Sequence, residues 1–115
     1  MKAMLLIYGS EAAWSALPAQ DLERETGAYM AFTEALIAAG KFVAAAQLQP
    51  VATAKSVSVG SGVGVADGPY VDTKEQLGGY FLIDVASMDE ALEWAAKCPG
   101  ARYGGIEVRP IFERS

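Results

Sequence analysis

Residues 79–92 read GYFLIDVASMDEAL, an apolar run that passes directly into the start of a helix. The apolar run, residues 79–86, has the length and composition of a buried strand. Ser87 and Glu90 then form a capping box, in which a serine hydroxyl and a glutamate three residues later cap the first helical turn. Apolar side chains occupy both sides of the strand: Phe81, Ile83 and Val85 on one, Tyr80 and Leu82 on the other.

The chain before and after this stretch continues the alternation of strands and helices. Residues 2–8 predict an apolar strand, residues 9–17 a loop, and residues 18–39 a long helix that begins with a proline. The remaining predicted strands are residues 42–48, 53–59, 63–66 and 105–112. The two short middle strands form a hairpin around Gly60-Ser61-Gly62. Without this hairpin the order is βαββαβ, so we expect an α+β, ferredoxin-like fold with an inserted β-hairpin and one domain over residues 1–115.

The long helix has an apolar stripe on one side, which we expect to pack against the sheet. The predicted stripe consists of Leu22, Thr26, Tyr29, Met30, Thr33, Leu36 and Ile37. Only two helices are available in this order, and in a ferredoxin-like fold both cover the same face of the sheet.

The first strand shares the two-sided apolar pattern, with Met4, Leu6 and Tyr8 opposite Leu5 and Ile7. An antiparallel sheet with one face in water normally alternates apolar and polar residues. A second copy of the chain is the simplest cover for the other face, which predicts a homodimer through the sheet face. The alternative is a monomer with an open groove for an apolar ligand.

Composition excludes several kinds of function. The 115 residues carry a net charge of −5, which argues against nucleic-acid and anionic-membrane partners. The absence of histidine excludes a histidine-dependent triad and any imidazole metal site, and one cysteine excludes an internal disulfide. The apolar run from Ala3 to Tyr8 is shorter than the core of a secretory signal, so we expect a cytoplasmic protein.

Four stretches, in order along the chain, resemble the YCII-related proteins, and more narrowly their DGPF-domain branch. They are Met4 to Gly9, Asp67-Gly68-Pro69-Tyr70, Thr73 to Ile83 and Asp89 to Ala95, and Glu107 to Ile111 matches the usual tail. Tyr70 stands where the branch has phenylalanine. The resemblance covers nearly the whole chain and implies a dimeric α/β barrel of ferredoxin-like subunits, without an established reaction.

A His–Asp pair is the catalytic pair proposed for the wider family. This chain lacks the histidine, so only the aspartate of the Asp-Gly motif, Asp67, corresponds to it. The DGPF branch is often encoded near extracytoplasmic-function sigma factors, which implies a link with stress-responsive transcription.

Asp67 is the candidate catalytic residue. Gly68 and Pro69 favour a fixed turn that holds the Asp67 carboxylate at the mouth of a cleft, where it would act as a general base. In the other interpretation, the carboxylate accepts backbone N–H groups of its own turn.

Five further residues are candidates for substrate binding. Lys74 either binds an anionic group or pairs with Glu75 or Asp72 at the surface, and Arg109 either clamps an anion or is an exposed edge residue. The remaining candidates are Tyr8, Tyr80 and Glu11. Each tyrosine either points its hydroxyl into a cleft or is a core residue. Glu11 would add a second carboxylate to share the acid and base roles.

Three functions remain open at this point. The first is an enzyme without cofactor or metal that acts on a small, anionic organic molecule, as an isomerase, lyase or hydrolase, with Asp67 as its acid–base group. The second is a non-catalytic module that binds a small molecule. The third is a dimerisation module.

Overall fold

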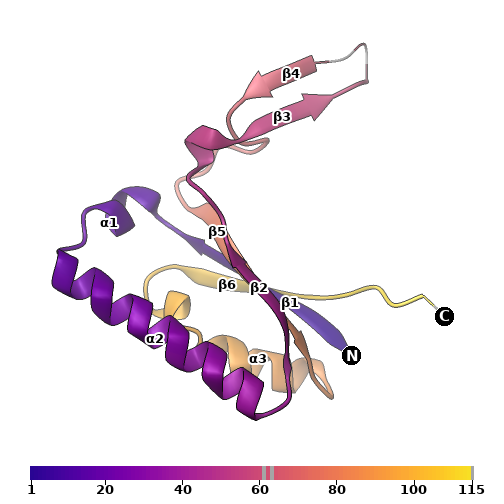
Figure 1. Cartoon of the computed structure of the whole chain (residues 1–115). Helices are drawn as coiled ribbons and strands as arrows, with labels where there is room; N and C mark the ends of the chain where they lie inside the picture. The colour runs from indigo at the N-terminus through magenta and orange to yellow at the C-terminus, as the bar shows by residue number, and fades with distance from the viewer. Residues whose placement is uncertain (61, 63, 115) are drawn as a thin grey trace.

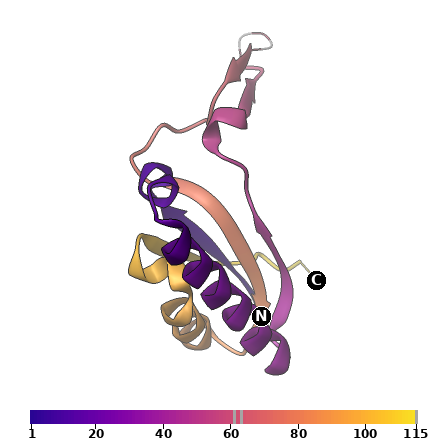
Figure 2. The ribbon, with the colours of Figure 1, turned by 60° about the vertical axis from the view of Figure 1, so that its left-hand side comes forward.

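The computed structural model describes residues 1–60, 62 and 64–114. Four strands form one antiparallel sheet in the order β2-β5-β1-β6, as a ferredoxin-like fold requires. They are β1 (Lys2–Gly9), β2 (Phe42–Gln47), β5 (Gln76–Asp84) and β6 (Gly105–Pro110). The two long helices, α2 (Ala19–Ala38) and α3 (Met88–Lys97), lie side by side on one face of this sheet (Figures 1 and 2). The predicted α+β, ferredoxin-like fold is confirmed.

The hydrophobic core lies between the helices and the sheet. Leu5 of β1 is directly opposite Phe81 of β5 and Val108 of β6, and Leu5 has no exposed surface. Phe32 of α2 packs edge-on against Phe81, with ring centroids 5.0 Å apart. Burying a leucine or phenylalanine side chain contributes about 2 kcal/mol, so these contacts fix α2 over the centre of the sheet.

The capping box predicted before α3 is present. The Ser87 hydroxyl accepts the backbone N–H of Glu90 at 3.2 Å. The Glu90 carboxylate reaches back one residue further than predicted, to the backbone N–H of Ala86 at 2.8 Å. This bond lowers the pKa of Glu90 below the usual glutamate range, aided by Lys41, whose ammonium lies 3.5 Å away.

The predicted apolar stripe of α2 is only partly correct. Leu36 is buried and Tyr29 half-buried, but Met30 and Ile37 are 61% and 57% exposed. The buried stripe is rotated toward Glu25 and Phe32, which are separated by seven residues and so lie on one side of the helix. Packing against Phe81 and Trp94 favours the larger ring of Phe32 over the flexible Met30 side chain.

The other face of the sheet is not covered by the described residues of this chain, and we call it the open face. Strand alternation and register place Met4, Leu6, Tyr8, Tyr80 and Leu82 on it, opposite the buried residues of the same strands. Glu107 and Arg109 of β6 share this face and form an ion pair at 3.1 Å. The two-sided apolar pattern is therefore present in the folded sheet.

Residues 48–75 form an arm that projects from the end of the sheet (Figures 1 and 2). It holds the short 3-10 helix η1 (Val51–Thr53) and the hairpin strands β3 (Lys55–Ser58) and β4 (Gly64–Asp67), which form a separate sheet. The predicted hairpin is present, while the predicted turn residue Ser61 and the predicted strand start at Val63 lie outside the described residues. The arm raises the radius of gyration to 15.9 Å, against about 13 Å for a compact chain of this length.

Two short helices stand where the sequence predicted loops. Helix α1 (Glu11–Ser15) follows β1 within the predicted loop of residues 9–17, capped by the Ser10 hydroxyl, which accepts the Ala13 N–H at 3.1 Å. The 3-10 helix η2 (Pro99–Arg102) links α3 to β6. A helix of five residues shows too little periodicity to be read from sequence, so its cap was the one available signal. Within the described residues, no helix combines the length and apolarity that crossing a membrane needs.

Candidate functional site

A cleft of about 670 Å³ opens at the end of the sheet from which the arm projects. Its walls come from α1, the first half of α2, the ends of β1 and β2, the start of β5 and the link between η2 and β6. The lining residues that carry aromatic side chains are Tyr8, Trp14, Tyr29, Tyr80, Phe81 and Tyr103. Polar side chains of its lining are Ser10, Glu11, Ser15, Thr26, Gln47 and Gln76. A concave site with apolar walls and a few polar groups is the usual form of a small-molecule site.

Two glycines allow the walls of the cleft to meet. A Cβ atom on Gly104 would overlap the Tyr8 carbonyl oxygen and lie 2.9 Å from the Gly9 Cα. A Cβ atom on Gly100 would lie 2.7 Å from the Tyr29 hydroxyl oxygen. The link between η2 and β6 can therefore lie directly against β1 and α2 only because both positions lack a side chain.

Glu11 is a cleft residue whose backbone N–H and carboxylate both form hydrogen bonds to other parts of the chain. Its backbone N–H donates to the Gln76 side-chain oxygen at 2.9 Å, which ties α1 to β5. Its carboxylate accepts the backbone N–H of Val51 at 3.0 Å, which ties α1 to the base of the arm. The role of Glu11 as a second acid–base carboxylate stays a prediction, and the contacts show that it also fixes one wall of the cleft.

Tyr29 is a half-buried lining residue of the cleft and is held by aromatic packing. Its ring is parallel to that of Phe81, with centroids 6.5 Å apart. Burial raises the pKa of the Tyr29 hydroxyl well above the usual tyrosine range, and the Cys98 thiol and the Glu25 carboxylate add to this. Tyr29 therefore stays protonated at neutral pH and can serve as a hydrogen-bond donor or acceptor, but not as a phenolate.

A buried carboxylate that the sequence reading missed lies behind the cleft. The Glu25 side chain is only 4% exposed, and it accepts the Tyr103 hydroxyl at 2.6 Å and an Arg102 N–H at 3.4 Å. Glu25 lies seven residues before Phe32 and eleven before Leu36, so it belongs to the buried stripe of α2. A charged residue in register with core positions was the signal that could have identified it.

The charges around the cleft are unevenly distributed. Glu11 is the only charged residue among the described lining residues, and no lysine or arginine is among them. Arg102 lies next to the cleft but turns toward Glu25. This lining lacks the cation that recognises a carboxylate or phosphate group.

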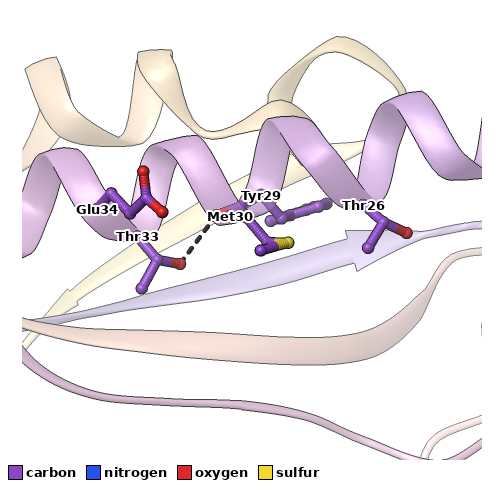
Figure 3. A pocket seen from close by; sticks show the side chains of 5 residues that line it. All are labelled: Thr26, Tyr29, Met30, Thr33 and Glu34. Carbon is purple, nitrogen blue, oxygen red and sulfur yellow. Dashed lines mark hydrogen bonds between the residues drawn. The ribbon is translucent and has the colours of Figure 1, made fainter.

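A second, shallower hollow of about 340 Å³ lies along α2 (Figure 3). The Thr33 hydroxyl donates to the Tyr29 carbonyl of its own helix, and Thr26 donates in the same way to Leu22. Met30, which is largely exposed, is the aliphatic side chain of this lining. With its hydroxyl donors engaged by the helix backbone, this hollow offers a ligand far fewer polar groups than the cleft does.

The YCII-related domain family matches residues 1–115, the whole chain. This chain belongs to the YCII-related family. A relative, an uncharacterized protein of Rhizobium meliloti (strain 1021), is 37% identical over 110 residues, which cover 93% of this chain and 89% of the relative.

A solved structure shares the fold of this YCII-related protein. It is the 5-chloro-2-hydroxyhydroquinone dehydrochlorinase of Burkholderia phenoliruptrix AC1100 in complex with 2,5-dihydroxybenzoquinone. The two structures align with a TM-score of 0.57 over 99% of this chain and 96% of the dehydrochlorinase, at 15% sequence identity. At that identity the likeness concerns the fold.

In the YCII-related protein, Asp67 lies on the arm rather than in the cleft of its own chain. Its side chain is 85% exposed and pairs with the Lys55 ammonium, 2.7 Å away across the hairpin. Gly68 has the positive φ, 99°, that the sequence predicted for the turn, and its N–H donates to the Ala54 carbonyl at 2.7 Å. The turn thus fixes the base of the hairpin and directs Asp67 toward its outer surface.

The other predicted residues of the YCII-related protein fall in three places. Tyr8 and Tyr80 line the cleft together with Glu11, while strand alternation places both tyrosine rings on the open face of the sheet. Arg109 is also on the open face, paired with Glu107, and Lys74 is exposed in the arm. The chain therefore brings three of the six candidates to the cleft and separates Asp67, Lys74 and Arg109 from it.

The described residues of the YCII-related protein contain no group of three or more aspartate, glutamate, cysteine or histidine side chains placed to hold a metal ion. The single cysteine, Cys98, is buried, and its burial raises the pKa of the thiol. The Cys98 thiol therefore stays protonated at neutral pH, as its place near the negative end of α3 also favours.

Proposed function

We propose that this YCII-related protein is an enzyme that binds a small hydroxylated ring compound in the cleft and transforms it by proton transfer, without a cofactor. The observation that carries the proposal is the lining of the cleft, which combines aromatic rings with hydrogen-bonding side chains. Aromatic walls suit a flat ring, and the hydroxyl and amide groups suit ring hydroxyls.

The lining favours a neutral substrate over the anionic one expected from sequence. Lys74 and Arg109, the two cations predicted to bind an anion, are outside the cleft, and Glu11 supplies a negative charge within it. A carboxylate or phosphate ligand would lose water without gaining an oppositely charged partner. The dehydrochlorinase that shares the fold acts on a hydroxylated ring, which supports the same class of compound.

In this proposal Asp67 is the acid–base group for the cleft of a neighbouring subunit and not for the cleft of its own chain. Within one chain the Asp67 carboxylate is exposed and pairs with Lys55 on the arm, and the arm extends away from the body (Figure 2). The apolar open face supports a homodimer, and an arm that extends beyond its own body can reach a neighbouring subunit. We also propose that the chain belongs to the DGPF-type branch of the family, because the Asp67 to Tyr70 motif forms the turn at the base of the arm.

The test compares ring compounds that differ in charge. Thermal unfolding of the protein is measured with resorcinol and with benzoate, each over a concentration series. A ligand at 100 times its Kd stabilises by about 2.7 kcal/mol, which raises the Tm of a domain this size by several degrees. We expect resorcinol to raise the Tm more than benzoate. A larger effect of benzoate, or none with either compound, would contradict the proposed substrate class.

Proton transfer is tested in D2O with the bound ring compound. We expect the enzyme to speed exchange of the ring hydrogens of resorcinol, seen as loss of their proton NMR signals. Asp67→Asn should slow the exchange at unchanged resorcinol affinity, and Asp72→Asn, which alters another exposed carboxylate of the arm, is the control. Binding without any exchange would favour the alternative function, a non-catalytic binding module.

A dimerisation module is the remaining alternative, and the open face favours it independently of the cleft. Met4, Leu6, Tyr80 and Leu82 form an apolar surface there. Apolar patches of this kind mark interaction sites in proteins that otherwise have polar surfaces. This alternative and the enzyme are compatible, because pairing of the sheets leaves a cleft at the end of each sheet.

A further inference from the structure

The Glu25 carboxylate and the Tyr103 hydroxyl form a pair whose second member faces the cleft. Glu25 is the only charged side chain that is buried among the described residues. A carboxylate taken out of water to this extent is costly unless donors surround it, and Tyr103 and Arg102 are those donors. The bond from Tyr103, at 2.6 Å, has the short length of a hydrogen bond to a charged acceptor.

This bond decides what Tyr103 can offer to a ligand. A tyrosine hydroxyl has one hydrogen, and that of Tyr103 is donated to Glu25. The oxygen therefore keeps its lone pairs for an incoming donor, and Tyr103 is a lining residue of the cleft. The Glu25 bond also raises the pKa of Tyr103, although the nearby Arg102 and Arg24 partly oppose this, so the phenol is protonated at neutral pH.

We propose that Tyr103, held by Glu25, is the hydrogen-accepting group of the cleft and selects ligands that carry a hydroxyl or N–H donor. The inference rests on the proposed function, since it names the polarity of the same site. A ring hydroxyl would donate to the Tyr103 oxygen while the ring lies among the aromatic side chains.

The same pair provides a route for the proton in turnover. The O–H bond of the ligand breaks as a new O–H bond forms on the Tyr103 oxygen, and the original phenol proton passes to the Glu25 carboxylate. One negative charge moves from Glu25 to the ligand oxygen, and the total charge is unchanged. After the reaction, Glu25 returns its proton to Tyr103 and Tyr103 returns one to the ligand, which restores the starting protonation states of the pair. Glu25 acts in this step through Tyr103 and is a positioning residue rather than one that contacts the ligand.

The polarity of the site is tested with two compounds of similar shape. Resorcinol has two hydroxyl donors, whereas 1,3-dimethoxybenzene has acceptors only. Kd values for the two are measured by NMR titration against the full chain. We expect about tenfold tighter binding of resorcinol, the size typical of one hydrogen bond within a charged pair.

Substitutions of Tyr103 and Glu25 then test whether this pair causes the preference for resorcinol. Tyr103→Phe should remove most of the tenfold preference, because the accepting oxygen is lost. Glu25→Gln should also reduce it, because an amide can donate to the phenol oxygen and release the phenol hydrogen toward the ligand. Tyr70→Phe, which changes a tyrosine that is 82% exposed and outside the cleft lining, is the matched control and should leave the preference unchanged.

A purely structural role for Glu25 predicts a different set of results. Glu25→Gln would then lower stability without altering the preference between the two compounds. Ultraviolet titration of the tyrosines gives a second measurement, in which Glu25→Gln should lower the pKa of one tyrosine relative to wild type. If Glu25→Gln does not fold, Tyr103→Phe carries the test alone, because the Tyr103 ring is largely exposed and Arg102 remains as a donor to Glu25.

Two failures can be told apart. Equal affinity of the wild type for both compounds, or a preference that survives Tyr103→Phe, overturns the inference and leaves the ring-binding cleft intact. Binding of neither compound overturns the proposed function and this inference with it.

Discussion

The two central strands of the sheet, β1 and β5, are apolar on both faces, but the two faces have different surroundings. On the helix-covered face, Leu5 and Ile83 have no exposed surface. On the open face, their neighbours Leu6 and Leu82 are only half-buried. Because these residues alternate along the same two strands, the difference comes from what covers each face and not from the strands themselves.

An apolar strand pattern therefore indicates how many faces of the sheet are covered, but not which element covers each face. Helices α2 and α3 cover one face, and the chain has no further helix among its described residues to cover the other. A second subunit on the open face would give both faces the same degree of burial. Substitutions on the two faces can therefore show whether both are buried in the assembled protein.

The largest effect is expected from Leu5→Ala, which removes a fully buried side chain next to Phe81 and Val108. It should lower the free energy of unfolding by about 3 kcal/mol, as cavity-forming leucine substitutions do. Leu6→Ala is the matched control on the open face and should cost about 1 kcal/mol in the monomer. Denaturant unfolding at two protein concentrations measures both, and a dimer through the open face requires that the cost of Leu6→Ala grow with concentration.

An intermediate effect is expected from Leu82→Lys on the open face. Leu82 faces Met4 and Ala44 across the sheet, so a lysine there would place a charge in the middle of the proposed interface. Sedimentation equilibrium should show twice the chain mass for wild type and the single-chain mass for the variant, which should still fold. Ile37→Lys, on the exposed side of α2, should leave the mass unchanged. A wild type that sediments as a single chain at micromolar concentration would contradict the sheet-face dimer.

The smallest effect is expected from the cap that begins α3, one of the two helices that cover the first face. The pKa of Glu90 is lowered in the folded protein by the Ala86 N–H, so its contribution is present above the unfolded pKa and is lost as the pH falls through the folded pKa. Glu90→Gln should therefore be less stable than wild type at pH 7, and the gap should close as the pH falls through the folded pKa of Glu90. Urea unfolding over a series of acidic and neutral pH values measures this gap, with Glu93→Gln on the exposed side of α3 as control. A gap that widens in acid would contradict the assigned bond.

Periodicity predicted the fold well because the central strands are continuous apolar runs with clear ends. The Ser87 cap located α3 to within a residue, and the two-sided pattern of β1 and β5 predicted a second apolar face that the two helices of the chain leave uncovered. The rotation of α2 was not predictable by the same means. Leu22, Met30 and Ile37 are more hydrophobic than Glu25, and only the fold supplies the Tyr103 and Arg102 donors that make a buried glutamate acceptable.

The candidate site was harder to predict because its residues come from segments far apart in the sequence. Glu25 and Tyr103 are separated by 78 residues, and no local motif links them. Tyr8 was identified at the end of the first strand, Glu11 in the loop after it and Tyr80 in a central strand, and all three line the cleft. Asp67 was chosen from its turn motif, and a turn motif reports the local backbone but not the direction in which the arm extends.

The position of the arm has a consequence for how the chain can vary in length. Strands β2 and β5 are antiparallel neighbours, with Gln47 opposite Gly79, so two or three residues would suffice to connect them. The chain instead leaves the sheet after β2, and the Gly68 N–H meets the Ala54 carbonyl where the hairpin closes. The arm is thus an insertion into a simple strand connection, and inserts of this kind can be lengthened, shortened or exchanged without altering the register of the strands that carry them. Such a segment is well placed to give relatives with the same body different partners or substrates.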